Sequence, residues 1–308
     1  MSIYTSVSEL IGKTPLLELK GIEEELSLKA KILAKLEYFN PTGSVKDRIA
    51  KAMIEDAEKS GKLTKNGVII EPTSGNTGIG IAAIGVSKGY KVIIVMPDTM
   101  SMERRTLIKA YGAQIVLTDG KTGMKGAIQK ANELKEELKG VILGQFSNPV
   151  NPRIHYDTTA REIYDDTQGK VDIFVAGVGT GGTLSGVGRF LKEKDKNIKI
   201  YAVEPKDSPV LSKGESGAHK IQGIGAGFIP DVLDTSVYDG VLTVTNEDAF
   251  NFAKIVRERD GVSVGISSGA SLKAAIELAK KQENEGKTIV VIFPDSGDRY
   301  LSTRLFQE

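Results

Sequence analysis

Apolar residues occur along the chain as short continuous runs separated by stretches with helical spacing. Runs rich in β-branched residues that are apolar throughout are typical of strands buried on both faces of a sheet. The predicted strands are Lys31–Leu36, Val68–Glu71, Lys91–Met96, Gln114–Leu117, Val141–Gln145, Asp172–Ala176, Lys199–Val203 and Thr288–Phe293. Helical spacing is found at Val45–Ser60, Gly78–Ser87, Met102–Tyr111 and Met124–Lys139. This alternation predicts an α/β fold with mostly parallel sheets, helices on both sides and right-handed crossovers.

Two turn-rich segments interrupt the pattern. Asn40–Gly43 contains a proline and a glycine, and in Asn148–Pro152 two prolines flank turn-prone residues. The 308 residues, 40% of them hydrophobic, suffice for two domains with buried cores. We therefore predict one domain inserted into another between these breaks.

Composition and charge exclude several classes of protein. The net charge is +1 and the Lys and Arg residues are spread along the chain, which argues against a nucleic-acid partner. No apolar run has the length of a membrane span, and Met1–Leu17 lacks a signal-peptide pattern, so we expect a cytoplasmic protein without a membrane partner. The absence of cysteine rules out disulfides and thiolate chemistry. With only His155 and His219 as histidines, we expect no metal site.

The segment Asn40–Arg48 contains the first candidate for chemistry. Ser44 followed by Asp47 is close to a capping box, which predicts Ser44 as an N-cap and Lys46 in the first helical turn. The positive end of the helix dipole and burial would both lower the pKa of Lys46. A neutral lysine can attack an aldehyde and form a Schiff base. The alternative is a solvated surface lysine.

Three further segments lie between a predicted strand or turn and a helix start. Hydrogen-bond donors in Glu71–Gly78 suit a carboxylate, although an ordinary capped turn is the alternative. The glycines of Ala176–Thr183 let the backbone approach an oxyanion beside a helix start, which predicts a phosphate cradle. The hydroxyls of Val264–Ser271 could reach a ligand or merely cap a helix.

The glycine segment also fits a different function. Gly177, Gly179 and Gly182 match the dinucleotide pattern GxGxxG, and Glu204 follows where a ribose-binding acid would lie. An NAD-dependent dehydrogenase is therefore an alternative from an unrelated class. This pattern usually opens its domain, whereas here it lies deep in the chain. The dehydrogenase interpretation also leaves Lys46 unexplained.

Taken together, these motifs resemble the cysteine synthase (O-acetylserine sulfhydrylase) family of fold-type II pyridoxal-phosphate enzymes. The resemblance covers nearly the whole chain, with motifs at Ile11–Leu16, Pro41–Arg48, Glu71–Gly78, Gln145–Arg153, Gly179–Thr183, His219–Phe228, Gly265–Gly269 and Pro294–Gly297. It implies two three-layer α/β/α domains with a tryptophan synthase β-like fold. Residues 1–38 and 152–308 would form the larger, cofactor-phosphate domain. Residues 39–151 would form a smaller mobile domain with the substrate-carboxylate loop, and the cofactor would lie in the cleft between the domains.

The resemblance also implies a role for each site residue. Lys46 would form the internal aldimine with pyridoxal 5′-phosphate, and Asn76 would hydrogen-bond the ring oxygen of the cofactor. Ser267 would face the pyridine nitrogen, with Ser268 as the second choice. The cofactor phosphate would bind to Gly179, Thr180, Gly181, Gly182 and Thr183. The substrate carboxylate would bind to Thr73, Ser74, Gly75, Thr77 and Gln145.

The implied reaction is β-replacement, in which O-acetyl-L-serine and sulfide give L-cysteine and acetate through an aminoacrylate. A neutral serine opposite the pyridine nitrogen makes the ring a weaker electron sink, which favours loss of a β-substituent over transamination. Hydrogen-sulfide-producing replacement on L-cysteine, giving lanthionine or serine, and cystathionine β-synthase-type activity share these motifs. The family resemblance further implies a homodimer and a serine acetyltransferase C-terminus as a partner. A non-catalytic binding protein is the remaining alternative.

Overall fold

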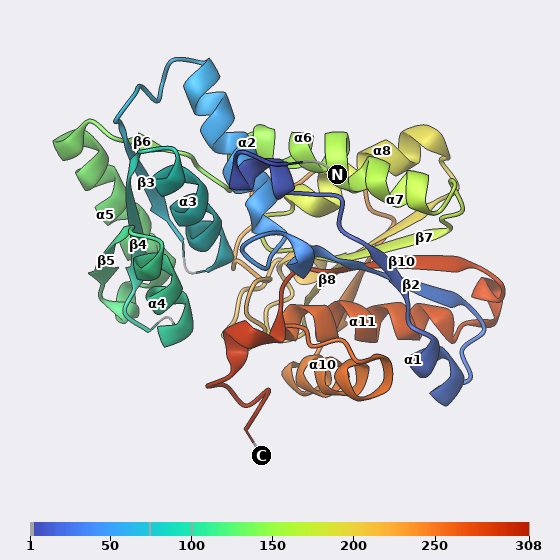
Figure 1. Ribbon diagram of the computed structural model, residues 1–308. Coiled ribbons are helices and arrows are strands. Elements are labelled where there is room, and N and C mark those ends of the chain that lie inside the picture. Colours follow the sequence, from blue (N-terminus) through green and yellow to red (C-terminus); the bar gives the residue numbers. More distant parts are fainter. Residues whose placement is uncertain (1–2, 74, 100, 308) are drawn as a thin grey trace. The chain divides into compact units, whose positions relative to one another are not determined.

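The computed structural model describes residues 3–73, 75–99 and 101–307 (Figure 1). The chain divides into two compact units, the smaller comprising Met1–Ile11 with Asn40–Val150 and the larger Gly12–Phe39 with Asn151–Glu308. Residues 1–11 therefore group with the smaller unit, whereas the sequence expectation assigned all of residues 1–38 to the larger one. Each unit has a largely parallel sheet with helices packed on it, which confirms the predicted α/β class.

The smaller unit is built on a four-stranded, entirely parallel sheet in the order β5-β4-β3-β6. Its strands are β3 (Val68–Pro72), β4 (Lys91–Pro97), β5 (Gln114–Thr118) and β6 (Val141–Ile142). Its helical segments are η1 (Val7–Leu10), α2 (Lys46–Lys59), α3 (Asn76–Ser87), α4 (Met102–Ala110), η3 (Gly120–Thr122) and α5 (Gly123–Leu138).

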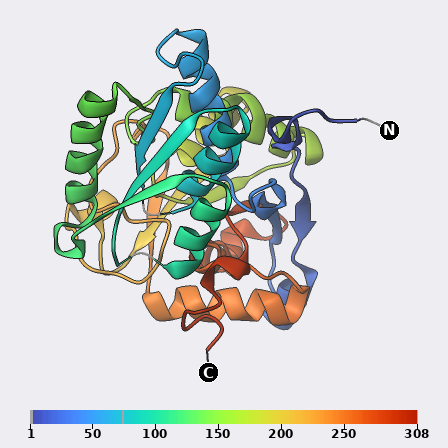
Figure 2. The same ribbon diagram turned by 60° about the vertical axis from the view of Figure 1, so that its left-hand side comes forward.

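Both faces of this sheet are covered, which explains why its strands are apolar throughout. Ile70 and Val95 pack with alanines of α5 on one face, and Ile69 and Ile94 lie against glycines of α3 on the other. In Figure 2 the green helix α5 and the teal helices α3 and α4 lie on opposite sides of the sheet. A Cβ on Gly85 would come within 2.8 Å of Val92 Cγ2, so glycine at this position permits the close approach of α3.

The larger unit has a six-stranded sheet in the order β1-β2-β10-β7-β8-β9, in which only β1 is antiparallel to its neighbour. Its strands are β1 (Leu16–Glu18), β2 (Lys31–Leu36), β7 (Ile173–Gly177), β8 (Lys199–Pro205), β9 (Gly240–Val244) and β10 (Thr288–Phe293). The two edge strands, β1 and β9, were not predicted from the sequence.

Helices cover both faces of the larger sheet as well. Its helical segments, together with α6 at the junction, are α1 (Lys20–Glu25), η2 (Glu37–Phe39), α6 (Val150–Ile154), the π-helix η4 (His155–Thr159), α7 (Ala160–Asp166), α8 (Gly182–Lys194), α9 (Val210–Lys213), α10 (Asn246–Asp260), α11 (Ile266–Ala279), η5 (Gln282–Asn284) and η6 (Gly297–Tyr300). On the central strand β10, Ile289 and Val291 face the core under α10 and α11, whereas Val290 and Ile292 face the core under α7 and α8. Figure 1 shows α11 and α8 on opposite sides of this sheet.

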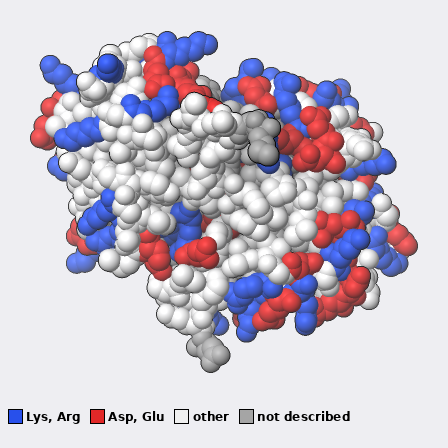
Figure 3. Space-filling model, in the orientation of Figure 1, with Lys and Arg blue, Asp and Glu red and all other residues white. Residues whose placement is uncertain are grey.

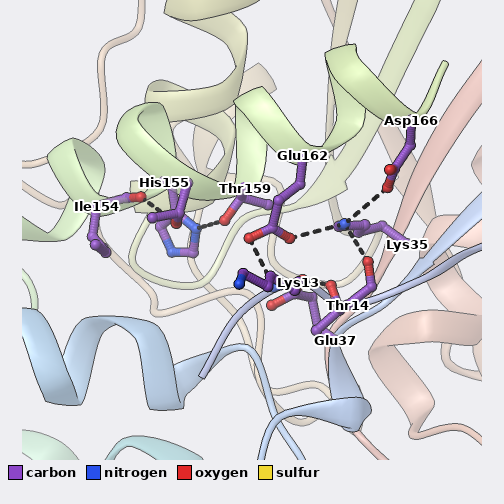
Figure 4. A network of polar contacts seen from close by, with 10 residues as sticks. Lys13, Thr14, Lys35, Glu37, Ile154, His155, Thr159, Glu162 and Asp166 are labelled. Carbon is purple, nitrogen blue, oxygen red and sulfur yellow. Dashed lines mark hydrogen bonds and ion pairs between the residues drawn. The ribbon is translucent and has the colours of Figure 1, made fainter. Parts of the chain in front are cut away.

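A buried cation links β2 to α7 in the larger unit. The Nζ atom of Lys35, whose side chain is fully buried, lies 2.9 Å from Glu162 Oε2 and 3.8 Å from Asp166 Oδ2. It also donates a hydrogen bond to the Thr14 carbonyl oxygen, and Glu162 Oε1 accepts the Lys13 backbone N–H at 3.0 Å (Figure 4). The segment that leads into the edge strand β1 is thereby fastened to α7.

Candidate active site

Lys46 is the first residue of α2, in the first helical turn as the sequence predicted. The N-cap of α2 is Val45, which supplies no side-chain hydrogen bond, so the prediction of Ser44 as the N-cap was one residue too early. The Ser44 hydroxyl oxygen nevertheless accepts the Lys46 backbone N–H at 3.2 Å. The carboxylate of Asp47 reaches back beyond Ser44, since it accepts the backbone N–H of Thr42 at 2.7 Å and the Thr42 hydroxyl. Lys46 is half-buried between two buried neighbours, at the positive end of a 14-residue helix.

The predicted carboxylate loop connects β3 to α3 in the same unit. Buried Thr73 accepts the Gly75 N–H on its hydroxyl at 3.3 Å, and α3 begins at Asn76, with Gly75 as an N-cap that supplies no side-chain hydrogen bond. Asn76 is half-buried at this helix start. Ser74 lies outside the described residues. The loop thus has the helix start that favours an anion.

Gln145, which is distant in sequence, meets this loop. The Thr77 hydroxyl donates to Gln145 Oε1 at 2.7 Å, and both side chains are buried. The backbone that carries Gln145 is bonded to Glu71, a buried carboxylate that the sequence analysis did not single out. The smaller unit therefore brings together Thr73, Gly75, Asn76, Thr77 and Gln145 around one helix start.

The predicted phosphate loop lies between β7 and α8 in the larger unit. Gly181 has a φ of 85° and is the N-cap of the 13-residue helix α8. Within the described residues, the backbone N–H groups of Gly179, Thr180 and Gly181 donate no hydrogen bond, whereas the Gly182 N–H reaches the Thr180 hydroxyl at 3.4 Å. Adjacent free donors at a helix start suit a phosphate, so these residues fit the group that the sequence predicted for them.

Packing inside the larger unit requires the glycines of this loop. A Cβ on Gly179 would lie 2.3 Å from the Gly223 carbonyl oxygen, and a Cβ on Gly182 would lie 1.8 Å from Asn151 Oδ1. The Asn151 side-chain amide also donates to the Thr180 hydroxyl at 3.0 Å. Asn151 is a supporting residue that the sequence analysis missed, because only the fold brings it next to the loop.

His155 supports the same loop from the π-helix η4. Its Nδ1 atom lies 2.9 Å from the hydroxyl oxygen of Thr159 in the same π-helix (Figure 4). Its Nε2 atom lies 3.3 Å from the Thr183 hydroxyl oxygen, a contact that the sequence did not predict. The imidazole is 1% exposed and therefore connects two buried segments instead of facing solvent.

Ser267 lies at the start of α11 and is buried. Its hydroxyl oxygen is 3.5 Å from the position that a Cβ on Gly223 would occupy, and the Gly223 carbonyl borders Gly179. The larger unit therefore places Ser267 and the phosphate loop on either side of Gly223. The hydroxyl of Ser268, the second choice for the same role, is buried and has no hydrogen-bond partner among the described residues.

Glu204 does not have the environment of a ribose-binding acid. Its buried carboxylate accepts the backbone N–H groups of Leu211 at 2.7 Å and Ser212 at 3.1 Å, and also the Ser212 hydroxyl. These bonds fasten the start of α9 to the end of β8. Both carboxylate oxygens of Glu204, the proposed ribose ligand of the dehydrogenase alternative, therefore accept hydrogen bonds from residues of the chain itself.

The described part of the chain contains no group of three or more His, Asp or Glu side chains placed to hold a metal ion, and none of its helices has the length and apolarity of a membrane span. On the face drawn in Figure 3, basic and acidic side chains are interspersed, in keeping with the net charge of +1.

Comparison with known proteins identifies the class. The family model described as pyridoxal-phosphate dependent enzyme matches residues 7–295. The chain therefore belongs to the family of pyridoxal-phosphate dependent enzymes, and it is an enzyme with that cofactor. A cysteine synthase of Staphylococcus aureus (strain Mu50 / ATCC 700699) is 53% identical over 302 residues, which cover 98% of this chain and 96% of the relative.

Solved structures agree in fold. Cysteine synthase from Entamoeba histolytica has a TM-score of 0.96 and 49% identity, covering 100% of this chain and 92% of that chain. A hydrogen sulfide-producing enzyme from Fusobacterium nucleatum has a TM-score of 0.93 and 49% identity, covering 97% of this chain and 100% of that chain. The family resemblance and the fold-type II architecture predicted from the sequence are confirmed.

Proposed function

We propose that this protein makes L-cysteine by β-replacement, exchanging the acetoxy group of O-acetyl-L-serine for sulfide. The observation that carries the proposal is the buried serine hydroxyl of Ser267 beside the glycine loop of a pyridoxal-phosphate enzyme. A serine, unlike an aspartate, does not keep a pyridine nitrogen protonated, and this favours loss of a β-substituent. The 53% identity to a cysteine synthase along almost the whole chain supports the same substrates.

Each unit would contribute different groups to the cofactor. We assign the phosphate to residues 179–183, because the N–H groups of residues 179–181 are free donors at a helix start, where they would stabilise a dianion. Lys46 would hold the cofactor covalently through its amine, Asn76 would hydrogen-bond the ring oxygen, and Ser267 would face the pyridine nitrogen. When bound, pyridoxal phosphate supplies an electron sink for loss of a proton from the α-carbon of an amino acid.

The chain's own residues would then bind the substrate and move one proton. Thr73, Gly75, Thr77 and Gln145, together with Ser74, would hold the substrate carboxylate at the start of α3. The Lys46 amine, released from the cofactor by the incoming amino acid, would take the α-proton and later return it. We further propose that carboxylate binding makes the smaller unit move and exclude water, which small-angle scattering with and without an amino acid would test.

Steady-state assays would test the proposed substrates. O-acetylserine, O-phosphoserine, serine and cysteine are each supplied with sulfide or with a thiol, and the proposal requires the highest kcat/KM for O-acetylserine with sulfide. A specific comparison favours a second candidate, since a hydrogen sulfide-producing enzyme is 49% identical to 97% of this chain. Faster release of sulfide from L-cysteine, giving lanthionine or serine, would support that candidate and reject cysteine synthesis.

We also propose, from the family resemblance, a cytoplasmic homodimer whose active site binds a serine acetyltransferase C-terminus. Light scattering after size-exclusion chromatography would give the oligomeric state. A synthetic peptide with the acetyltransferase C-terminal sequence should compete with O-acetylserine. A monomer, or a peptide without effect on the KM for O-acetylserine, would contradict the respective proposal.

A further inference from the structure

Glu71 is a buried carboxylate at the end of β3, immediately before the proposed carboxylate loop, and it is 1% exposed. Its Oε2 atom accepts the backbone N–H groups of Leu143 at 3.1 Å and Gly144 at 3.0 Å. Its Oε1 atom accepts the backbone N–H of Gln145 at 3.1 Å. Three consecutive backbone donors therefore converge on a single side chain.

The Glu71 carboxylate accepts the backbone N–H groups that follow the last paired residue of β6. Strand β6 pairs with β3 only at Val141 and Ile142, so the following N–H groups have no strand partner on that side. Gly144 then turns the backbone with a φ of 74°, and its carbonyl accepts the N–H groups of two later residues. The side chain of Gln145 leaves this turn and meets the Thr77 hydroxyl. The position of the Gln145 side chain thus depends on the hydrogen bonds between its backbone segment and Glu71.

We propose that Glu71 is a positioning residue of the amino-acid site, which fixes the backbone at Leu143–Gln145 so that Gln145 and Thr77 together meet the carboxylate of the substrate. This inference rests on the proposed function, which assigns the carboxylate to these two side chains. Glu71 itself would not touch the substrate, because its oxygens are engaged by backbone N–H groups.

A carboxylate suits this position and an amide does not. Burial raises the pKa of Glu71 to about 7, and the three N–H groups act in the opposite direction. At pH 8 the ionised group offers lone pairs on both oxygens to its three donors. A glutamine at the same place turns its NH₂ group either toward the Gln145 N–H or toward the N–H groups of Leu143 and Gly144. At least one donor then loses its acceptor.

The test uses the purified holoenzyme with Glu71→Gln at pH 8. The visible absorbance of the cofactor is titrated with L-alanine, which has an α-carboxylate but no leaving group. Loss of a charged acceptor predicts roughly ten- to a hundredfold weaker binding. The covalent attachment at Lys46 and the KM for sulfide should stay unchanged. The matched control is Glu204→Gln, another buried carboxylate that accepts backbone N–H groups, and it should leave the L-alanine affinity unchanged.

A double-mutant cycle separates positioning from a general structural role. In a Gln145→Ala background the amide that Glu71 positions is absent, so Glu71→Gln should weaken L-alanine binding less than threefold. Full additivity of the two losses, or wild-type affinity in Glu71→Gln, would overturn the inference. If the glutamine variant does not fold, Glu71→Asp decides. Its shorter carboxylate should weaken binding at least threefold, and unchanged affinity would also overturn the inference.

These outcomes differ from a failure of the proposed function. If the wild-type protein shows no cofactor band, or no response to L-alanine, the proposed function itself is wrong. If the wild type responds and Glu71→Gln responds with equal affinity, only the positioning role is wrong.

Discussion

The substitution Gly181→Ala tests how the phosphate loop is built. Gly181 has a φ of 85°, and a Cβ at this position would lie 2.7 Å from Leu233 Cβ, 2.8 Å from its Cδ1 and 3.2 Å from its Cα. The variant therefore meets two costs. One is a side chain in the left-handed region, and the other is an overlap with Leu233 that includes its backbone.

The chain offers a matched control for the first of these costs. Gly214 has a φ of 73° and no heavy atom within 4 Å of its Cβ position, so Gly214→Ala has the backbone strain alone. That strain costs about 1 kcal/mol. Overlap in a packed region adds about 1–3 kcal/mol. The free energy of unfolding should therefore fall by about 1 kcal/mol in Gly214→Ala and by about 3 kcal/mol in Gly181→Ala.

Urea unfolding of the cofactor-free protein gives the two free energies, and equilibrium dialysis gives the affinity for pyridoxal phosphate. Gly181→Ala should lose at least tenfold in cofactor affinity, because the loop can no longer present its N–H groups in their present places. Gly214→Ala should keep the wild-type affinity. Equal losses in both variants, in stability and in affinity, would show that the contact with Leu233 does not shape the loop.

Other parts of the structure give three more predictions. The folded pKa of Glu71, about 7, exceeds the ordinary 4.5, so the folded protein holds an extra proton between these values. As the pH rises from about 4.5 to above 7, the free energy of unfolding of the wild type should therefore fall by about 3 kcal/mol relative to that of Glu71→Gln. Urea unfolding at several pH values measures this, and a difference between the two proteins that does not change with pH would contradict it. Lys35→Met leaves Glu162 without its buried cation and should lower the free energy of unfolding by about 3 kcal/mol. The double variant Lys35→Met/Glu162→Leu should regain part of this loss. Wild-type stability of Lys35→Met would refute the role of the ion pair. Thr183→Val removes the hydroxyl bonded to His155 and should weaken cofactor binding about tenfold in equilibrium dialysis, with little change in melting temperature. Undiminished affinity for pyridoxal phosphate would reject a role of the Thr183 hydroxyl in cofactor binding.

Most of the fold could be predicted because strands covered on both faces are apolar throughout. Lys31–Leu36 and Thr288–Phe293 were predicted with the bounds that they have in the structure. The strand β1 has only three residues at a sheet edge, and β9 begins with a glycine and is mostly half-buried, so neither shows such a run. The predicted strand Val141–Gln145 ends at Ile142 because the Glu71 carboxylate, not a neighbouring strand, bonds the next N–H groups.

The site could be predicted where its residues are contiguous. Lys46 was predicted in the first turn of a helix, and α2 begins at Lys46. The glycine segment was predicted beside a helix start, and α8 begins within it at Gly182. The supports of the site could not be predicted in the same way. Asn151 and His155 act on residues far along the chain, and Glu71 contacts backbone atoms, which have no signature in the sequence of the partner. Such contacts depend on how the strands and helices pack.

The proposed reaction depends on the amine of Lys46 holding the cofactor. The most direct test is reduction of the purified holoenzyme with borohydride, followed by proteolysis and mass mapping, with Lys51 on the same helix as the internal reference. We predict one pyridoxyl group, on Lys46, together with loss of the visible band and of all turnover in Lys46→Ala. An unmodified Lys46, or an adduct on Lys51 with activity retained in Lys46→Ala, would contradict the proposed role of Lys46.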